Sequence, residues 1–151
     1  FDHYKKLNYG FGTDGAASSN TLNPMEQARL FGLLGKYQDR NSAEYTAEEI
    51  WKHLIASHQA FPFGSGRMKE GAPADLVIWD LYQPDTFPFY SPISSILYSS
   101  NSQNVKYTMV AGEFLKYDGK LKMDTEALMK EAIRLQKELL ARGKGKAEVT
   151  Y

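Results

Sequence analysis

The segment GTDGAASSN, residues Gly12–Asn20, places one carboxylate, Asp14, between a short apolar run at Leu7–Phe11 and a helix start at Asn23. The apolar run predicts a strand, and the small residues after it predict a loop that leads into the helix. In α/β folds, chemistry is usually placed where a rigid strand ends and a variable loop begins. Asp14 at such a point can bind a cation, take a proton from water, or cap a turn, since Asp-Gly is also a common turn pair.

The composition is that of a globular domain with neither a nucleic-acid nor a membrane partner. The 151 residues are 42% hydrophobic and include 18 basic and 18 acidic side chains, so the formal net charge is zero. Nucleic-acid binding needs clustered Lys and Arg, and a membrane helix needs about 20 consecutive apolar residues. The chain has no cysteine, which excludes disulfides and thiolate metal ligands and favours a cytoplasmic location. A chain that opens with Phe1 and shows no signal peptide is expected to be a truncated piece of a longer protein.

Two helices are expected in the first half of the chain. Asn23 is a suitable N-cap for a helix from Pro24 to about Gln38, with Glu26 at the capping-box position. Thr46 and Glu49 form a capping box for a second helix, which runs from Ala47 to about Gln59 and ends before the proline of Phe61–Gly64. Helical spacing predicts that a set of large apolar residues faces a core: Leu30, Phe31, Leu34 and Tyr37 from the first helix, Ile50 and Leu54 from the second.

The chain after residue 64 is expected to be mainly strand, followed by a helix. The expected strands are Arg67–Glu70, Leu76–Leu81, Lys106–Ala111 and Glu113–Tyr117, with turns at 111–113 and 117–120. The apolar run Leu76–Trp79 predicts burial on both faces. The connection from Gln83 to Asn104 contains a possible helix at Ile93–Ser99, and a last helix begins at Asp124 and runs to about Arg142. The apolar stripe of this helix consists of Leu128, Ala132, Leu135 and Leu139. Its charged residues are expected to form a solvated face with i,i+4 pairs.

The three histidines do not predict a metal site. His53 and His58 are five residues apart on the second helix, which separates them by about 140° around the axis. A pair of helical metal ligands needs the i,i+4 spacing of one face. His3 stands alone near the first residue. We interpret all three as surface or partly buried polar residues.

Three motifs in order resemble the amidohydrolase superfamily. GTDGAASSN resembles the end of the eighth barrel strand in its aminohydrolase and chlorohydrolase branch, which includes S-adenosylhomocysteine/methylthioadenosine deaminases. Gly66–Ile78, GRMKEGAPADLVI, resembles that family's turn and strand "G-x-[LI]-x-x-G-x-x-A-D-L-V". Thr108–Glu113, TMVAGE, resembles its "V-x-V-x-G" hairpin. The resemblance spans nearly the whole chain, and within it Asp75 is expected to fix the turn before a strand.

The resemblance implies an α/β fold that is the C-terminal fragment of a metal-dependent hydrolase. Residues 1–63 would be the end of a TIM-like barrel, with its last βα unit and the following helix. Residues 64–123 would be strands of a small β-sandwich domain with a connecting loop, and residues 124–151 a C-terminal helix and tail. The His-x-His pair and other histidines that hold the metal in this family would lie upstream of Phe1. The fragment alone is therefore expected to be inactive and to pair with the missing N-terminal part or with another copy of itself.

The resemblance also implies a divalent metal, zinc or iron, whose bound water becomes hydroxide near neutral pH and attacks a heterocyclic substrate. The attack displaces ammonia or chloride from a purine- or triazine-like ring. Asp14 would approach the metal and carry the proton from the water to the leaving group. Thr13, Ser18 and Asn20 would support the loop or the substrate. Ser19 departs from the family pattern, which has Asn at this position.

A second hypothesis remains open at this stage. The chain can also be a stand-alone, non-catalytic α+β module for binding or assembly. An upstream reading frame with His-x-His after a strand favours the hydrolase, and a reading frame that starts close to Phe1 favours the module.

Overall fold

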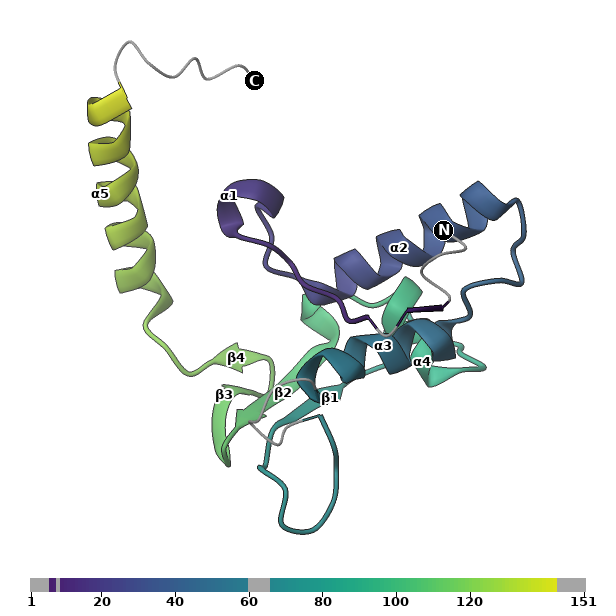
Figure 1. Cartoon of the computed structure of the whole chain (residues 1–151). Coiled ribbons are helices and arrows are strands. Elements are labelled where there is room, and N and C mark those ends of the chain that lie inside the picture. The colour runs from purple at the N-terminus through teal and green to yellow at the C-terminus, as the bar shows by residue number, and fades with distance from the viewer. Residues whose placement is uncertain (1–5, 8, 60–65, 144–151) are drawn as a thin grey trace.

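The structure, a computed structural model, describes residues 6–7, 9–59 and 66–143 (Figure 1). The expected helix stop at Phe61–Gly64, residues 1–5 and the tail after residue 143 lie outside the described residues. The elements in chain order are α1 (Ala16–Ser19), α2 (Pro24–Asp39), α3 (Ala47–Gln59), β1 (Leu76–Trp79), α4 (Pro92–Tyr98), the 3-10 turn η2 (Ser102–Asn104), β2 (Val105–Val110), β3 (Glu113–Tyr117), β4 (Lys120–Leu121) and α5 (Thr125–Gly143).

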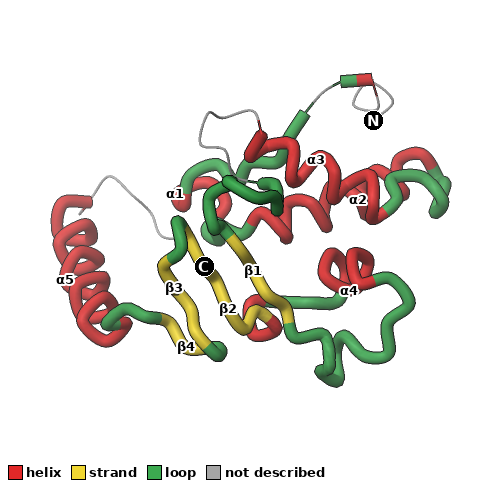
Figure 2. The backbone as a smooth tube through the Cα atoms, turned by 90° about the horizontal axis from the view of Figure 1, so that it is seen from below, coloured by secondary structure: helices red, strands yellow, loops and turns green. Residues whose placement is uncertain are grey.

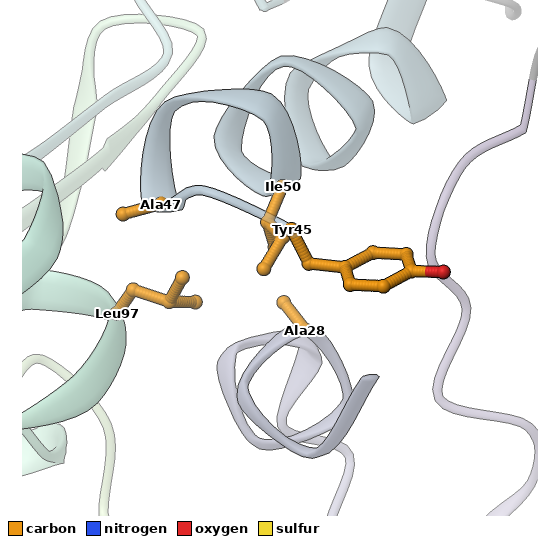
Figure 3. Close-up of a cluster of buried hydrophobic side chains, with 5 residues drawn as sticks. All are labelled: Ala28, Tyr45, Ala47, Ile50 and Leu97. Carbon is orange, nitrogen blue, oxygen red and sulfur yellow. The ribbon is translucent and has the colours of Figure 1, made fainter. Parts of the chain in front are cut away.

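A small apolar core joins α2, α3 and α4. Its buried side chains are Ala28 on α2, Tyr45 and Ala47 at the entry to α3, Ile50 on α3 and Leu97 on α4 (Figure 3). Ile50 and Leu97 are the largest side chains that are fully buried. The helix predicted at residues 93–99 is therefore real, and it packs back onto the first half of the chain.

Arg29 ties α4 to α2 by hydrogen bonds that sequence reasoning did not anticipate. Its Nε donates to the carbonyl of Leu97 at 2.7 Å, and its Nη2 donates to the carbonyl of Ser100 at 2.6 Å. Leu97 lies in the last turn of α4, where unpaired carbonyls favour a cation, and Ser100 follows the C-cap Ser99. The guanidinium thus closes the end of a short helix and fixes it on the core.

The prediction of which face of α2 is buried is wrong. Of the four large residues expected there, Phe31 packs against the edge of the core, and three are exposed: Leu30, Leu34 and Tyr37. The buried positions belong to the smallest residues of the helix: Ala28, Gly32 and Gly35. A Cβ added at Gly32 would lie 2.6 Å from Ile50 Cδ1, and one at Gly35 would lie 2.7 Å from the Tyr45 ring. The helices meet along a seam that leaves no room for larger side chains.

The helix starts follow the sequence closely. The Asn23 side chain accepts a hydrogen bond from the Met25 amide at 3.1 Å. Glu26 does not complete a capping box with Asn23 but accepts from the Thr21 hydroxyl at 2.6 Å. At α3 the capping box is formed, because the Thr46 amide donates to Glu49 at 2.9 Å and the Glu49 amide donates to the Thr46 hydroxyl at 3.3 Å.

We expect the Thr46–Glu49 capping box to give α3 a pH-dependent stability. The hydrogen bonds from the Thr46 amide and hydroxyl hold the pKa of the Glu49 carboxyl below its usual range. A carboxyl whose pKa is lower in the folded state stabilises the fold above its unfolded-state pKa of about 4.3, and this stabilisation is lost as the pH falls through the folded pKa. Urea unfolding should show that Glu49→Gln destabilises the chain at pH 7 and much less at pH 3. Glu70→Gln in an exposed turn is the control, and an equal effect of Glu49→Gln at both pH values would contradict the prediction.

The four strands form one antiparallel sheet in the order β1-β2-β3-β4. The turn after β2 has positive φ at Ala111 (51°) and Gly112 (84°), and the turn after β3 has positive φ at Asp118 (45°) and Gly119 (78°). Positive φ at both central residues is the geometry of a two-residue hairpin that matches the strand twist. Both turns predicted from the sequence are confirmed.

Three strand predictions are corrected by the structure. Val77 and Ile78 of β1 are 52% and 51% exposed, so β1 is not buried on both faces. β1 pairs only with β2 among the described strands, and the helices pack mainly on one another and not on the sheet (Figure 2). Neither Arg67–Glu70 nor the described part of Leu7–Phe11 is a strand. A strand requires a hydrogen-bonded neighbour, and these segments have none among the described strands.

Helix α5 stands apart from the α2–α3 unit in both views (Figures 1 and 2). Asp124 caps it as predicted, since its Oδ1 accepts from the Ala127 amide at 2.9 Å. Its charged face carries the expected ion pairs, such as Lys130–Glu126 at 2.8 Å. Its apolar side chains are all at least 45% exposed: Leu128, Met129, Ile133, Leu135, Leu139 and Leu140. Among the described helices, none has the length and apolar character required to cross a membrane.

Candidate functional site

Asp14 lies in an exposed loop directly before α1. Its backbone has φ of 57°, in the left-handed region, and its Oδ1 accepts a hydrogen bond from the Gly15 amide at 2.7 Å. One carboxylate oxygen is thus bound by the amide of the next residue. The structure gives the other oxygen, Oδ2, no hydrogen-bond partner among the described residues, so it is open to a proton or a cation.

The loop around Asp14 is held by short-range contacts. The Thr13 hydroxyl donates to the Asp14 carbonyl at 3.1 Å. The Ser18 amide donates to the Gly15 carbonyl at 2.9 Å, and the Asn20 amide donates to the Ala16 carbonyl at 3.1 Å, which closes the single turn of α1. Thr13 therefore contacts Asp14 directly, whereas Ser18 and Asn20 take part through their backbones.

Two residues of this loop have backbone conformations that cost free energy. Asp14 and Asn20 have φ of 57° and 60°. Residues other than glycine seldom adopt positive φ, and Asp and Asn adopt it more readily than most. Such conformations gather at functional sites, where the surrounding structure maintains them. Ser19, the residue that departs from the family pattern, has a buried hydroxyl with no hydrogen-bond partner among the described residues.

An aromatic cluster fixes the segment that precedes the loop. The Phe11 ring lies edge-on to Tyr9 at 5.8 Å and to Phe31 of α2 at 5.3 Å, measured between centroids. Tyr9 also stacks on His53 of α3. Burial raises the pKa of the Tyr9 hydroxyl, and the nearby Glu49 carboxylate raises it further. The approach to Asp14 is thus built on α2 and α3, although it forms no strand.

The described residues fit a divalent metal only in part. They contain no group of three or more His, Cys, Asp or Glu side chains that could hold an ion. Catalytic zinc sites generally take three protein ligands and keep one position open. Asp14 can supply one ligand of the hard, anionic type that a divalent cation accepts. His53 instead lies against Tyr9, so the interpretation of this histidine as a partly buried polar residue is confirmed.

Two surface hollows of the described residues do not include Asp14. One, of about 480 Å³, is lined by Lys36–Gln38 and Arg40 at the end of α2. The other, of about 310 Å³, lies between the loop at 86–91 and α4. Asp14 is instead exposed to solvent. A substrate pocket at this carboxylate would need walls from protein beyond the described residues.

Asp75 has the structural role that was expected. Its Oδ1 accepts a hydrogen bond from the Ala111 amide at 2.7 Å, and the Gly112 amide donates to the Ala74 carbonyl at 3.1 Å. These bonds join the residues before β1 to the turn that follows β2. Asp75 therefore fixes the start of the sheet and is not part of the candidate site.

Similarity to known proteins agrees with this arrangement. A model described as the Amidohydrolase family matches residues 3–115. The 5-methylthioadenosine/S-adenosylhomocysteine deaminase of Caldicellulosiruptor saccharolyticus is 40% identical over 87% of the chain, and that of Thermotoga maritima is 42% identical over 85%. The matched region is 31% of each relative, so the chain spans about a third of the length of the curated relatives it matches.

Solved structures show the same likeness in three dimensions. A zinc-bound adenosine deaminase from Xanthomonas campestris superposes with a TM-score of 0.83 over 92% of this chain and 33% of its own, at 26% identity. A mutant atrazine chlorohydrolase from Arthrobacter aurescens TC1, complexed with zinc and atraton, superposes with a TM-score of 0.77 over 85% of this chain and 30% of its own, at 25% identity. The expected fold class is confirmed: the α/β arrangement with its antiparallel sheet is part of the amidohydrolase fold. The chain belongs to the amidohydrolase family.

Proposed function

We propose that the chain is the C-terminal segment of a metal-dependent amidohydrolase and that Asp14 is its proton-carrying carboxylate. The substrate class is a purine- or triazine-like ring from which a C–N or C–Cl bond is hydrolysed. The names of the relatives support this class, because they include deaminases of methylthioadenosine and a hydrolase of a chlorinated triazine. One observation carries the proposal. The Asp14 carboxylate is exposed, held by its own loop, and keeps one oxygen open.

The proposed mechanism assigns the proton to the open oxygen of Asp14. A divalent metal, zinc or iron, held by Asp14 and by ligands from the rest of the enzyme, would make a nucleophile available at neutral pH by lowering the pKa of water toward about 7. Asp14 Oδ2 would accept a proton from the attacking water, whose oxygen bonds to the ring carbon. In deamination the C–N bond then breaks, and Asp14 returns the proton to the nitrogen that leaves as ammonia. Oδ1 stays bonded to the Gly15 amide and keeps the carboxylate oriented throughout.

The remaining loop residues support Asp14. Thr13 fixes the Asp14 carbonyl through its hydroxyl. Ser18 is exposed in the same loop and is open to a ligand, whereas Asn20 ends α1 and shapes the loop. We assign Thr13 and Asn20 to loop support and Ser18 to loop or substrate support.

The division of the chain is also a proposal. Residues 1–63 would be the end of a TIM-like barrel, residues 64–123 would be β-sandwich strands with a connecting loop, and residues 124–151 would be the C-terminal helix and tail. The separate packing of α2, α3 and the sheet supports the first two ranges. α4 belongs to the second range by sequence but packs on α2 and α3.

The missing N-terminal part of the enzyme is the proposed partner. The exposed apolar side chains of α5 and β1 support this, because soluble proteins seldom leave large apolar patches uncovered. Pairing with a second copy of the chain is the alternative way to cover them. A cytoplasmic location is also proposed, and the absence of cysteine supports it.

The chain by itself is expected to be inactive. Asp14 supplies one metal ligand, and catalytic zinc generally needs three from protein. Elemental analysis of the purified chain after incubation with zinc should find less than stoichiometric metal, and a deaminase assay with methylthioadenosine should find no turnover. Stoichiometric metal together with turnover would refute the expectation.

The sequence upstream of Phe1 tests the proposed function as a whole. A reading frame that continues through a His-x-His motif after a strand and then further histidines supports it. A start codon close to Phe1 would overturn it and favour the non-catalytic α+β module.

A further inference from the structure

One histidine anchors the backbone that leads to Asp14. The His53 ring stacks on the Tyr9 ring with 3.8 Å between centroids and 9° between planes. His53 Nδ1 also lies 3.1 Å from the Tyr9 carbonyl oxygen. Since a carbonyl oxygen can only accept, this hydrogen bond places a proton on Nδ1. A single side chain on α3 thus holds both the ring and the backbone of Tyr9.

The anchored segment consists of residues 9–11, whose two aromatic rings pack on the helices. The Tyr9 and Phe11 rings pack on Phe31 of α2, at centroid distances of 5.4 and 5.3 Å. Beyond Phe11 a Cβ added at Gly12 would meet nothing within 4 Å. The hydrogen bonds described for the Asp14 side chain and carbonyl reach no further than Gly15 and Thr13. On its upstream side, the carboxylate therefore takes its position from the anchored residues 9–11.

We propose that His53 is a positioning residue for Asp14. It acts through Tyr9, to which both of its described ring contacts are made. The proposal rests on the proposed function for its catalytic consequence, but the anchor itself is a property of this chain. Loss of a ring stack together with a hydrogen bond is enough to raise the equilibrium constant for local opening of a segment by about tenfold.

Two substitutions of His53 separate the contribution of the ring stack from that of the hydrogen bond. His53→Phe keeps a ring for the stack and removes the donor. His53→Asn keeps a donor at the place of Nδ1, because its amide nitrogen is attached to Cγ as Nδ1 is, and it removes the ring. His53→Ala removes both contacts. His58→Ala is the matched control, since His58 is an exposed histidine on the same helix.

Cleavage by chymotrypsin measures the anchor without any catalysis. The enzyme cuts after Tyr9 and Phe11 only when this segment opens, and mass spectrometry separates these products from cleavage after Tyr107 in β2. We expect His53→Ala to raise the rates at Tyr9 and Phe11 by about tenfold, with smaller increases for His53→Phe and His53→Asn. The rate at Tyr107 and all rates in His58→Ala should stay at the wild-type values. Equal rates in His53→Ala and His58→Ala, or a rise at Tyr107 as large as that at Tyr9, would overturn the proposal.

Turnover of the intact enzyme separates positioning from general support of the fold. Misplacing a reacting group by a fraction of an ångström lowers kcat, so His53→Ala should lower kcat about tenfold or more and leave KM nearly unchanged. His53→Asn and His53→Phe should each recover part of kcat. An unchanged kcat in His53→Ala, in an enzyme that Asp14→Asn inactivates, would overturn the positioning role. Normal turnover in Asp14→Asn would instead refute the proposed function and leave the chymotrypsin result as the test of the anchor.

Discussion

Asp14→Asn in the intact enzyme is expected to lower kcat by about 10²- to 10⁴-fold, the range typical for loss of a general acid–base. An amide oxygen cannot take up the proton that the carboxylate carries. The fold should be preserved, because Asn accepts the Gly15 hydrogen bond as Asp does and also tolerates positive φ. The measurement is steady-state turnover of a purine nucleoside, with circular dichroism and thermal unfolding to confirm that the variant is folded.

Asp124→Asn is the matched control for this experiment. Asp124 is also an exposed aspartate that accepts a backbone hydrogen bond, in this case from Ala127 at the start of α5. Asn is an equally good N-cap, so this variant should keep wild-type stability and turnover. Turnover of Asp14→Asn within twofold of the control would remove Asp14 from the mechanism.

Ile50→Ala is expected to cause the largest loss of stability, about 2–4 kcal/mol in the free energy of unfolding. Ile50 is 1% exposed and belongs to the same buried cluster as Ala28 of α2 and Leu97 of α4 (Figure 3). Truncation removes buried methyl groups and leaves a cavity that the three helices cannot readily close. Urea unfolding of the chain, followed by circular dichroism, measures the change.

Leu34→Ala tests whether the core lies where the structure places it. Helical periodicity puts Leu34 on the core face of α2, but in the structure its side chain is 45% exposed. We expect this variant to lose less than about 1 kcal/mol, as surface substitutions usually do. A loss as large as that of Ile50→Ala would mean that α2 is rotated toward the face predicted from the sequence.

The elements that could be predicted from the sequence are those formed by residues close together in the chain. The bounds of α2, α3 and β3 match the expected ranges to within about two residues, and the caps at Asn23, Thr46 and Asp124 are present. Caps and hairpin turns are formed by residues two to four positions apart, so their chemistry is contained in a short window of sequence. The three motifs likewise predicted the amidohydrolase family, which the family model confirms.

Predictions that required knowledge of packing failed. The core face of α2 is its glycine seam, because α3 and α4 approach too closely for leucine. β1 reads as a buried strand, yet Val77 and Ile78 are half exposed, since the described chain provides no layer over them. The contact between Tyr9 and His53 joins residues 44 positions apart, and no spacing rule connects them.

The sequence by itself determined the helix starts, the hairpin turns, the family and Asp14 as the candidate acid, because each depends on residues close together in the chain. The tertiary structure decided which face of α2 is buried, how α4 returns to the core through Arg29, and how His53 holds the approach to Asp14. Those arrangements depend on close packing between segments distant in sequence, where the size of one side chain sets the position of another.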